Sequence, residues 1–573
     1  MGDNNNNTAV ATVNSNEDAF EELNDGFDPE KAARLVLSYH SDRLRKNLTY
    51  PNNLKMRGKP TILESFGFGS FSKNSGKWNS HKKEDADIQK AAKRLSTLNL
   101  SSGPGRPSNA GGRASTAGGG GYSNPFAAKH NKIDEKNIKE LEKEMDENTG
   151  KFLTEDQIAR RLIPDEVKAY FGESEHTVSM WSFNLLDLKT QSPLKWMVFE
   201  TLSRFDLLSH FKVPIDVLNN FCTEMEIGYQ IFENHYHNNI HAADVLQTIH
   251  HMLIFPGLYH WLDNVEMFAI LIAAAAHDWE HTGTTNNFHV KTRSDLATLY
   301  NDASCLENHH AATLFAYLNE PRTNICCNMN LADFNRFRAL VIEMILGTDM
   351  QQHFKQMTKM NDFLNNNTQL EKAFTMTVIL HSADISNPAK PYNVHSQWTD
   401  KLLDEYFQMG DDEAAMGMDI TPLCDRHTTR IPESQVGFID FIVSPCYKTL
   451  NTLLRHVCDE VLSNYNAEPK FDENEEDQEI DVDGKNNDDD ENASKNEKNK
   501  PESKTVSKEN SKTESWADFR KMSAKQSSFE IVSIEKMSDK VSEFQEKIEN
   551  ILASNKNTWK MIVDQNAAQA AEK

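Results

Sequence analysis

The central part of the chain, from about Trp181 to Tyr465, carries apolar residues at three- and four-residue spacing. Leu194, Met197 and Val198 are one example, and sustained alternation of period two is scarce. Spacing by three and four places side chains on one face of an α-helix, whereas a β-strand alternates at every second residue. Prolines interrupt the segment at intervals, so the pattern predicts an all-α domain built from one helix after another.

The two ends of the chain have different patterns. Pro29–Leu48 and Ile88–Leu98 each predict a short basic amphipathic helix, and Ser101–Tyr122 has the Gly-, Ser- and Pro-rich composition of a flexible linker. Asp472–Glu491 holds twelve Asp and Glu against one Lys, which predicts a solvated, disordered tail. We therefore expect five parts: a largely disordered N-terminus with short helices (1–130), a helical linker (131–177), the helical domain (178–465), an acidic disordered tail (466–515) and a C-terminal amphipathic helix region (516–573).

A second helical pattern lies near the C-terminus. Its apolar residues step by 3, 4, 3, 4 and 3, and they are Ile534, Met537, Val541, Phe544, Ile548 and Ile551. This heptad seam of about two and a half repeats is short for an independent coiled coil. Three interpretations stay open: a coiled coil, a helix that docks on the helical domain, and a helix that docks on a second copy of the chain.

Composition and charge exclude several classes of protein. The chain has 573 residues, 38% of them hydrophobic, and a formal net charge of −25. An acidic balance argues against a protein that coats a nucleic-acid polymer. The longest apolar run, Val265–Ala276, contains Glu266 and is too short to span a membrane. Seven cysteines without a C-x-x-C pair are typical of a reducing compartment, so we expect a cytoplasmic protein.

Three short motifs of the helical domain place His and Asp beside apolar sequence. His237 and His241 lie four residues apart, His277-Asp278 follows the longest apolar run, and Asp384 follows another apolar segment. Any one of these alone is more often an ordinary core, surface or turn residue. Together they would be costly to bury unless a cation compensated their charges. Imidazole and carboxylate ligands without cysteine favour a zinc-type site with open positions over a closed structural site.

The motifs also carry a family resemblance. H-N-x-x-H-x-x-D from His237, H-D-x-x-H-x-G-x-x-N from His277, A-D-I-S-N-P from Ala383 and S-Q-x-G-F-I-D from Ser434 together resemble the class I 3′,5′-cyclic nucleotide phosphodiesterases. The stretch HDWEHTGTTNNFHVKTRSDLATLYND is most similar to the calcium/calmodulin-dependent branch. The resemblance implies a compact all-α catalytic domain of the His-Asp (HD) phosphohydrolase type. It also implies cleavage of the 3′ phosphoester bond of cyclic GMP and cyclic AMP to 5′-GMP and 5′-AMP, which would terminate cyclic nucleotide signalling.

The resemblance assigns expected roles to individual residues. Zn²⁺ is expected at His241, His277, Asp278 and Asp384, with Asp278 also reaching a second metal, Mg²⁺ or Mn²⁺. A hydroxide shared by the two metals would attack phosphorus, and His237 would protonate the leaving 3′ oxygen as the general acid. Residues expected to hold metal-bound water or the catalytic imidazole by hydrogen bonds are His281, Glu307, His310 and Asn286.

A nucleotide pocket is expected further along the chain. Gln435 matches the purine-binding glutamine of the family, and its carboxamide offers one donor and one acceptor, so that turning it would suit adenine or guanine. Phe438 is expected to stack on the purine, with Leu402 as the opposite wall. The remaining residues expected to line this pocket are Asn387, His395, Trp398 and Thr399.

Partners follow from the same resemblance. Ile163–Phe171 is similar to the regulatory region of the calmodulin-dependent branch, but the long basic segment that follows it in that branch is absent here. Binding of calcium-calmodulin is therefore expected at Pro29–Leu48 or Ile88–Leu98, and a homodimer is possible. Two alternatives remain. One is another His-Asp phosphohydrolase acting on nucleotides or phosphomonoesters, against which Gln435 and Phe438 argue. The other is an inactive nucleotide-sensing or scaffold protein.

Overall fold

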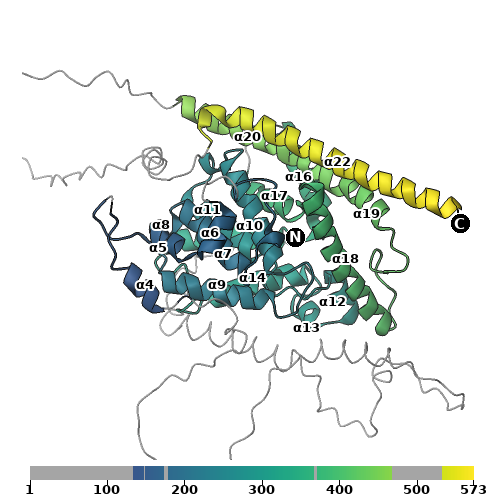
Figure 1. The fold of residues 1–573 in the computed structure, drawn as a ribbon, viewed down its shortest axis with the longest axis horizontal. Helices are drawn as coiled ribbons and strands as arrows, with labels where there is room; N and C mark the ends of the chain where they lie inside the picture. Colours follow the sequence, from purple (N-terminus) through teal and green to yellow (C-terminus); the bar gives the residue numbers. More distant parts are fainter. Residues whose placement is uncertain are drawn as a thin grey trace, which may run out of the picture.

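The computed structural model describes residues 133, 135–147, 149–172, 178–366, 371–467 and 532–572. Within these ranges the regular secondary structure is helical, and loops join the helices (Figure 1). The only extended pairing among these residues is an isolated bridge between Met145 and Phe152. The all-α prediction is confirmed. The basic segments Pro29–Leu48 and Ile88–Leu98, the linker Ser101–Tyr122 and the acidic run Asp472–Glu491 lie outside the described residues.

The described α-helices are, in chain order, α4 (Glu135–Leu141), α5 (Glu155–Leu162), α6 (Asp165–Phe171), α7 (Pro193–Arg204), α8 (Leu207–Phe211), α9 (Ile215–Tyr229), α10 (Asn239–Ile254), α11 (Asn264–Ala276), α12 (Asn286–Thr292), α13 (Asp295–Leu299), α14 (Cys305–Leu318), α15 (Leu331–Leu346), α16 (His353–Asn366), α17 (Lys372–Asp384), α18 (Tyr392–Ala415), α19 (Ile431–Phe438), α20 (Ser444–Ala467) and α22 (Met537–Glu572). Short 3-10 turns join them, namely η3 (Leu185–Asp187), η4 (Leu258–His260), η5 (Met350–Gln352), η6 (Asn387–Ala389) and η8 (Ile534–Lys536), and η7 (Ile439–Val443) is a single π-helical turn between α19 and α20.

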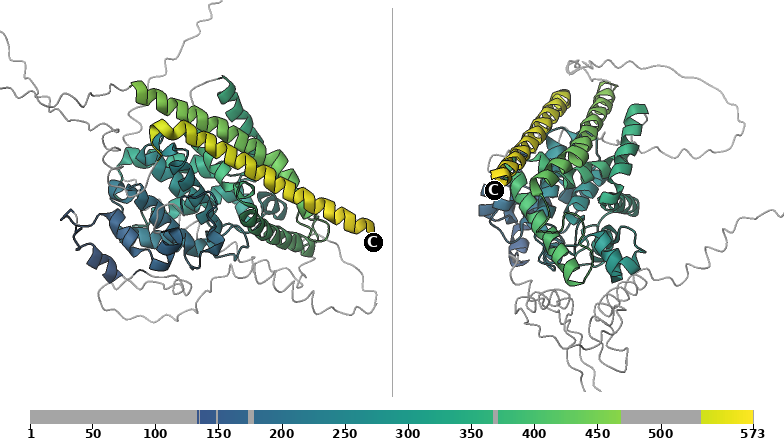
Figure 2. Two further views of the ribbon diagram at one scale, coloured as in Figure 1. Left: turned by 45° about the horizontal axis from the view of Figure 1, so that its top comes forward. Right: turned by 90° about the vertical axis from the view of Figure 1, so that its right-hand side faces the viewer.

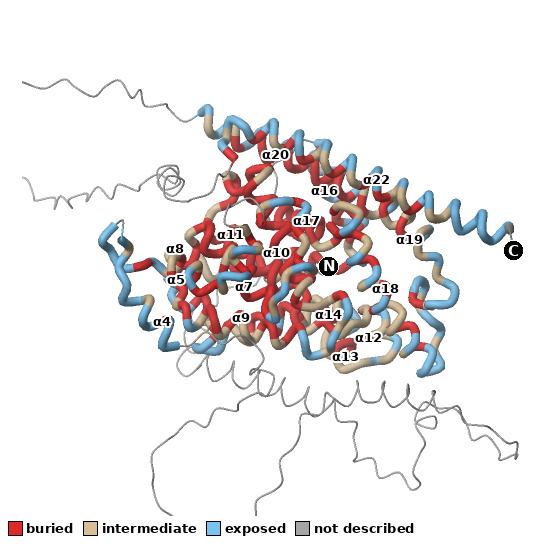
Figure 3. Tube along the Cα trace, in the orientation of Figure 1, coloured by how far each residue is buried: buried red, intermediate tan, exposed pale blue. Residues whose placement is uncertain are grey.

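Helix α11 lies at the centre of the apolar core. Every one of its residues is buried, and it packs against α10 and α15 (Figure 3). Its N-terminus is closed by a capping box, in which the Asp263 side chain accepts from the backbone N–H of Glu266 and the Glu266 side chain accepts from the backbone N–H of Asp263. Because α11 is fixed in this way, the residues at its C-terminal end emerge from the middle of the molecule.

The apolar core extends beyond both predicted limits of the helical domain. Ile158 of α5 and Val167 of α6 belong to the same buried cluster as α10 and α11, and so does Phe544 of α22. Helix α22 lies along α20 and also packs against α19 (Figures 1 and 2). Of the three interpretations of the heptad seam, the structure therefore has the helix docked on the chain's own helical domain.

The seam changes register partway along α22. Met537, Val541, Phe544 and Ile548 are buried as the heptad pattern predicts, but Leu552 is buried in place of Ile551. A straight α-helix has 3.6 residues per turn, so a seam with a period of 3.5 drifts around it. Because α22 docks on a globular domain and does not supercoil around another helix, the buried face follows the straight helix.

No helix among these described ranges is long and apolar enough to cross a membrane.

Helix α9 approaches the centre of the molecule closely at Gly228. An ideal Cβ built on Gly228 would lie 1.9 Å from Nε1 of Trp279, a buried side chain that stacks on Tyr317 with ring centroids 4.7 Å apart. We expect Gly228→Ala to lower the free energy of unfolding by about 1–3 kcal/mol, the usual cost of overpacking. Urea denaturation measures this loss. Gly437→Ala is the matched control, since nothing lies within 4 Å of its added Cβ; equal stability of both variants would contradict the prediction.

Candidate metal centre and adjoining pocket

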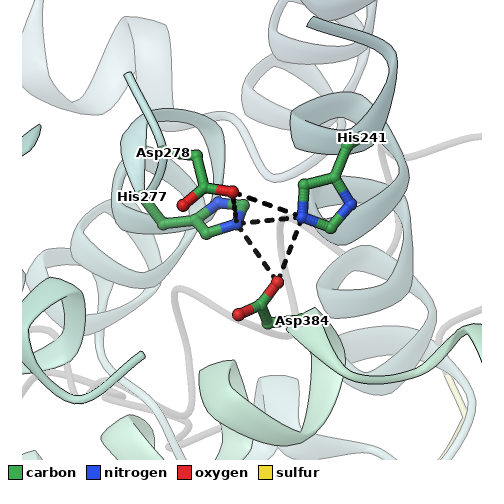
Figure 4. Close-up of side chains that lie close together, drawn as sticks. All are labelled: His241, His277, Asp278 and Asp384. Carbon is green, nitrogen blue, oxygen red and sulfur yellow. Dashed lines mark hydrogen bonds and ion pairs between the residues drawn. The ribbon is translucent and has the colours of Figure 1, made fainter. Parts of the chain in front are cut away.

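Four predicted metal ligands meet at one point of the structure. His241 lies in the first turn of α10, His277 caps the C-terminus of α11 with Asp278 directly after it, and Asp384 is the last residue of α17. One ligand atom from each side chain lies within 4.8 Å of the other three (Figure 4). Three elements that are far apart in the sequence thus supply two imidazoles and two carboxylates to one small site.

The distances suit a cation better than direct contact between the side chains. Nε2 of His241 and Nε2 of His277 lie 3.3 Å apart, and each lies 3.1–3.4 Å from Oδ2 of Asp278 and from Oδ1 of Asp384. Oδ2 of Asp278 is buried and has no hydrogen-bond partner. A divalent cation at the centre would bind all four atoms, which are of the kinds that zinc prefers. The donor set therefore fits a metal ion.

The electrostatics of the cluster keep both carboxylates ionised. Burial would raise the pKa of Asp278 and of Asp384, but the adjacent His277 imidazole outweighs burial and lowers both pKa values below their ordinary range. Burial would lower the pKa of His277, but the charges of Asp278 and Asp384 raise it well above the ordinary value. An ionised carboxylate is the form that binds a cation, so the site carries the negative charge it needs at neutral pH.

A second group of possible ligands shares Asp278 with the first. Asp278, His281 and His310 also offer ligand atoms within 4.8 Å of one another. Nδ1 of His310 lies 2.8 Å from the carbonyl oxygen of Trp279 and donates to it, which leaves Nε2 as a buried lone pair without a hydrogen-bond partner. Burial lowers the pKa of His310 to about 3 and that of His281 well below its ordinary value, so both rings are neutral. The neutral rings of His281 and His310, together with the carboxylate of Asp278, could therefore bind a second metal ion or its water ligands.

The predicted general acid, His237, is held by Glu405, a residue that lies outside the sequence motifs. Nδ1 of His237 contacts Oε1 of Glu405, a buried carboxylate of α18. Oε2 of Glu405 accepts from the backbone N–H groups of Tyr236 and His237 at 2.8 and 3.0 Å. Burial would lower the pKa of His237, but the charge of Glu405 and its hydrogen bond raise this pKa to about 9. In return, the charge of His237 and the same hydrogen bond lower the pKa of Glu405 to about 2, although burial would raise it.

His237 also faces the metal cluster. Its ring stacks on that of His281 with centroids 3.9 Å apart and lies 5.7 Å from the His241 ring. The side chain is 21% exposed, whereas those of His241 and His277 are 3% and 0% exposed. His237 is therefore a protonated imidazole at the accessible edge of the site.

Glu307 and Asn286 bond mainly to each other. Nδ2 of Asn286 donates to both carboxylate oxygens of Glu307 at 3.1 and 2.9 Å, and its Oδ1 accepts from the backbone N–H of Leu306. Burial and the charge of Asp349 raise the pKa of Glu307 to about 7. Neither residue belongs to the groups that could share a metal among the described residues, so their contact with metal-bound water stays a prediction.

The predicted pocket residues come from η6, α18 and α19. Leu402 packs beside Trp398 in a small cluster with Tyr236, whereas Phe438 packs against the main core. Gln435 is 9% exposed. The two opposed walls of a purine slot, Phe438 and Leu402, stay a prediction.

His395 and its neighbours form a buried polar chain. Nδ1 of His395 lies 3.0 Å from Oδ1 of Asn387 and 3.3 Å from Oγ1 of Thr399, and its Nε2 accepts from Nε1 of Trp559 at 2.9 Å. Nδ2 of Asn387 donates to the hydroxyl of Tyr236 at 3.3 Å. Both ring nitrogens of His395 are thus occupied within the chain, which connects this residue to α22.

Comparison with known proteins agrees with the geometry. Residues 236–465 match the profile of the family described as 3′5′-cyclic nucleotide phosphodiesterase. The chain is 47% identical over 284 residues to the dual specificity calcium/calmodulin-dependent 3′,5′-cyclic nucleotide phosphodiesterase 1C of Mus musculus, covering 49% of this chain and 40% of that protein. It is 46% identical over 276 residues to the corresponding 1B protein of Bos taurus, covering 48% of this chain and 52% of that protein.

A crystal structure of the phosphodiesterase domain of the RhoPDE fusion protein from the choanoflagellate Salpingoeca rosetta is also similar. It is 30% identical, with a TM-score of 0.46, over 53% of this chain and 98% of that one. The chain spans about half or less of the length of the two curated relatives, 40% and 52%. The family resemblance and the calcium/calmodulin-dependent branch predicted from the motifs are confirmed.

Proposed function

Because residues 236–465 belong to the 3′5′-cyclic nucleotide phosphodiesterase family, we propose that the protein hydrolyses cyclic GMP and cyclic AMP. The reaction breaks the 3′ phosphoester bond, gives 5′-GMP and 5′-AMP, and so terminates a cyclic nucleotide signal. The single observation that carries the proposal is the convergence of His241, His277, Asp278 and Asp384 beside a protonated His237. We assign the catalytic domain to residues 178–465, with residues before and after it in regulatory roles.

The metal ions are assigned from the donor set. His241, His277, Asp278 and Asp384 would hold Zn²⁺, and Asp278, which also belongs to the group with His281 and His310, would serve a second ion, Mg²⁺ or Mn²⁺. When bound, the two ions supply the positive charge that activates water and stabilises the phosphate. His281 and His310 lie beside Asp278 and would hold water bound to the second ion by hydrogen bonds. Asn286 and Glu307 would contribute to the same hydrogen bonds.

His237 supplies the proton for the leaving group. Glu405 fixes the imidazole through Nδ1, so the opposite nitrogen, Nε2, is left to donate to the 3′ oxygen as its bond to phosphorus breaks. Because Glu405 raises the pKa of His237 to about 9, the ring is protonated at neutral pH before substrate arrives. A general acid must hold its proton at the working pH, and the His237–Glu405 pair meets that requirement.

The base is held on the α18 and α19 side of the site. Gln435 hydrogen-bonds the purine edge, and Phe438 and Leu402 enclose the ring. Asn387, His395, Trp398 and Thr399 complete the pocket, either directly or through the polar chain that joins them. The names of the 1B and 1C relatives describe dual specificity, which supports both cyclic nucleotides as substrates.

Regulation by calcium-calmodulin is part of the same proposal, supported by the names of those relatives. The proposed calmodulin-binding segments are Pro29–Leu48 and Ile88–Leu98. A homodimer and a cytoplasmic location complete the proposal. The location is supported by the seven cysteines, all of which are free thiols.

An assay of both cyclic nucleotides, with and without calcium-calmodulin, tests the proposed function. We expect 5′-GMP and 5′-AMP as products, identified by chromatography, and loss of turnover on chelation of divalent metals. Release of phosphate from nucleotides with cyclic nucleotides left intact would favour a different His-Asp phosphohydrolase. A protein without bound zinc, whose stability does not change on chelation, would favour an inactive nucleotide-sensing or scaffold protein.

Deleting residues 1–122 is expected to remove stimulation by calcium-calmodulin, because both basic segments are lost. The basal rate should persist, since this deletion removes none of the described residues. Measuring the rate of cyclic GMP hydrolysis across a calmodulin titration, for the full chain and the truncated chain, checks this result. Stimulation that survives the truncation would place the sensor elsewhere, for example in α22.

A further inference from the structure

Helix α22 joins the predicted nucleotide pocket from outside the region that matches the family. The family match ends at residue 465, whereas α22 spans Met537–Glu572. In Figures 1 and 2 the helix runs along α20 towards α19. Its first half is apolar against the core, with Met537, Val541 and Phe544 all buried. This half anchors the helix and determines which residues of the second half reach the domain.

The second half of α22 makes polar contacts with the segment that follows the metal ligand Asp384. Nδ2 of Asn555 donates to the carbonyl oxygens of Pro388 and Lys390, both at 2.8 Å. Asn555 is 1% exposed, so its amide is buried with these two partners. The two carbonyls flank the end of η6, the turn that begins at Asn387. Asn555 therefore fixes the backbone of this turn.

Trp559 fixes a histidine of the pocket. Its Nε1–H donates to Nε2 of His395 at 2.9 Å, and both side chains are buried. An indole nitrogen can only donate, so Nε2 of His395 must be the acceptor and the proton of the neutral ring must lie on Nδ1. Trp559 thus selects one tautomer of His395.

The selected tautomer orients the next residues along the chain of hydrogen bonds. Nδ1–H of His395 donates to Oδ1 of Asn387 at 3.0 Å, which turns Nδ2 of Asn387 towards the hydroxyl of Tyr236 at 3.3 Å. Tyr236 precedes His237 in the sequence. If Nδ1 lost its proton, it could no longer donate to the amide oxygen, and the Asn387 carboxamide would be free to turn.

We propose that Trp559 and Asn555 of α22 are positioning residues for the nucleotide pocket. Trp559 acts through His395 and Asn555 through the backbone of η6, and together they hold Asn387 in the orientation that recognises the base or ribose. The changes in KM and substrate preference that we expect from this inference rest on the proposed function. The docked α22 sets substrate affinity and the preference between cyclic GMP and cyclic AMP, while the metal cluster and His237 carry the bond cleavage.

Two conservative variants of the full chain test the proposal. Trp559→Phe keeps an aromatic ring but removes the donor, and Asn555→Ala removes the amide. We expect each to raise KM for at least one cyclic nucleotide by about three- to tenfold, the range for loss of one net hydrogen bond. The ratio of kcat/KM values for cyclic GMP and cyclic AMP should change, while kcat stays within about twofold, since the expected loss lies in binding.

Asn557→Ala is the matched control, because Asn557 is an exposed asparagine on the same helix. It should leave KM and the substrate ratio unchanged. If the wild-type protein hydrolyses cyclic nucleotides and both Trp559→Phe and Asn555→Ala keep the wild-type KM and ratio, the proposal is wrong. A loss of kcat with unchanged KM in both variants would also overturn it.

A second measurement does not depend on turnover. Nitrogen NMR of protein labelled at histidine reports the tautomer of His395, whose signals are identified by their absence in His395→Asn. We expect a ring protonated at Nδ1 in the wild-type protein and a loss of that signature in Trp559→Phe. If the wild-type protein leaves cyclic nucleotides intact, the proposed function fails, and an unchanged His395 signal in Trp559→Phe then overturns this inference separately.

Discussion

Replacing Asp278 by asparagine is expected to abolish hydrolysis of both cyclic nucleotides. Asp278 belongs both to the metal cluster and to the group with His281 and His310, with Oδ2 facing His241 and His277 and Oδ1 3.8 Å from Nε2 of His310. The substitution keeps the size of the side chain but removes its charge. Removing a residue that only orients a metal ligand typically lowers metal affinity or activity by about 10- to 100-fold. Removing a shared ligand should therefore lower kcat by more than about 100-fold.

Steady-state kinetics and metal analysis of the same sample check this prediction. Asp400→Asn, at an exposed position of α18, is the matched control and should retain wild-type turnover. Zinc content should fall in Asp278→Asn and stay unchanged in the control. Activity of Asp278→Asn close to that of the wild type would show that Asp278 does not serve both metals.

Removing the His237 imidazole should slow turnover without emptying the metal site. A positioned general acid typically contributes about 100- to 10,000-fold, and His237→Ala should lower kcat by an amount in this range. Zinc content should remain nearly complete, because His237 is not among the four side chains that meet at the metal cluster. Loss of zinc in this variant would instead make His237 a ligand.

The pH profile separates the acid from its partner. The acidic form of His237 is present below its pKa of about 9 and disappears as the pH rises through that value, so kcat should decline on the alkaline side. Glu405→Gln removes the charge that raises this pKa, and the decline should move towards neutral pH. Glu433→Gln, on α19, is a suitable control; the same alkaline limb in Glu405→Gln and in the control would refute the assigned pairing.

The metal cluster could be anticipated because its residues border strongly apolar helices. His277-Asp278 follows α11 and Asp384 ends α17, so a fold that buried these helices had to place imidazole and carboxylate groups at the edge of its core. The order and spacing of the motifs then indicated the family. The individual roles of these residues remain predictions that the variants above test.

Glu405 could not be found in this way. It lies in the mixed apolar and acidic stretch LLDEYFQ of α18, where an acidic residue is ordinary, and its partner His237 is 168 residues away in the sequence. Its burial depends on how α18 approaches the turn before α10, which is a tertiary event. A hydrophobic pattern reports which face of one helix is buried, but it does not report which distant backbone amides a carboxylate will meet.

The contacts of the C-terminal helix could not be predicted from the sequence for the same reason. Its heptad pattern predicted an apolar seam but not the surface that the seam covers, and the pattern ended at Ile551, before Asn555 and Trp559. These two side chains carry the polar contacts with η6 and α18. A periodic pattern contains no information about such single contacts, because each depends on the placement of a different helix.

The ends of α11 and α17 have a consequence for the order in which ligands bind. Both helices end at the metal cluster, so the negative ends of two helix dipoles point at the same place as the carboxylates of Asp278 and Asp384. Such a potential attracts cations and repels a phosphate diester. Substrate should therefore bind appreciably only after the ions have reversed the sign of the potential. We expect metal binding to precede the binding of a cyclic nucleotide.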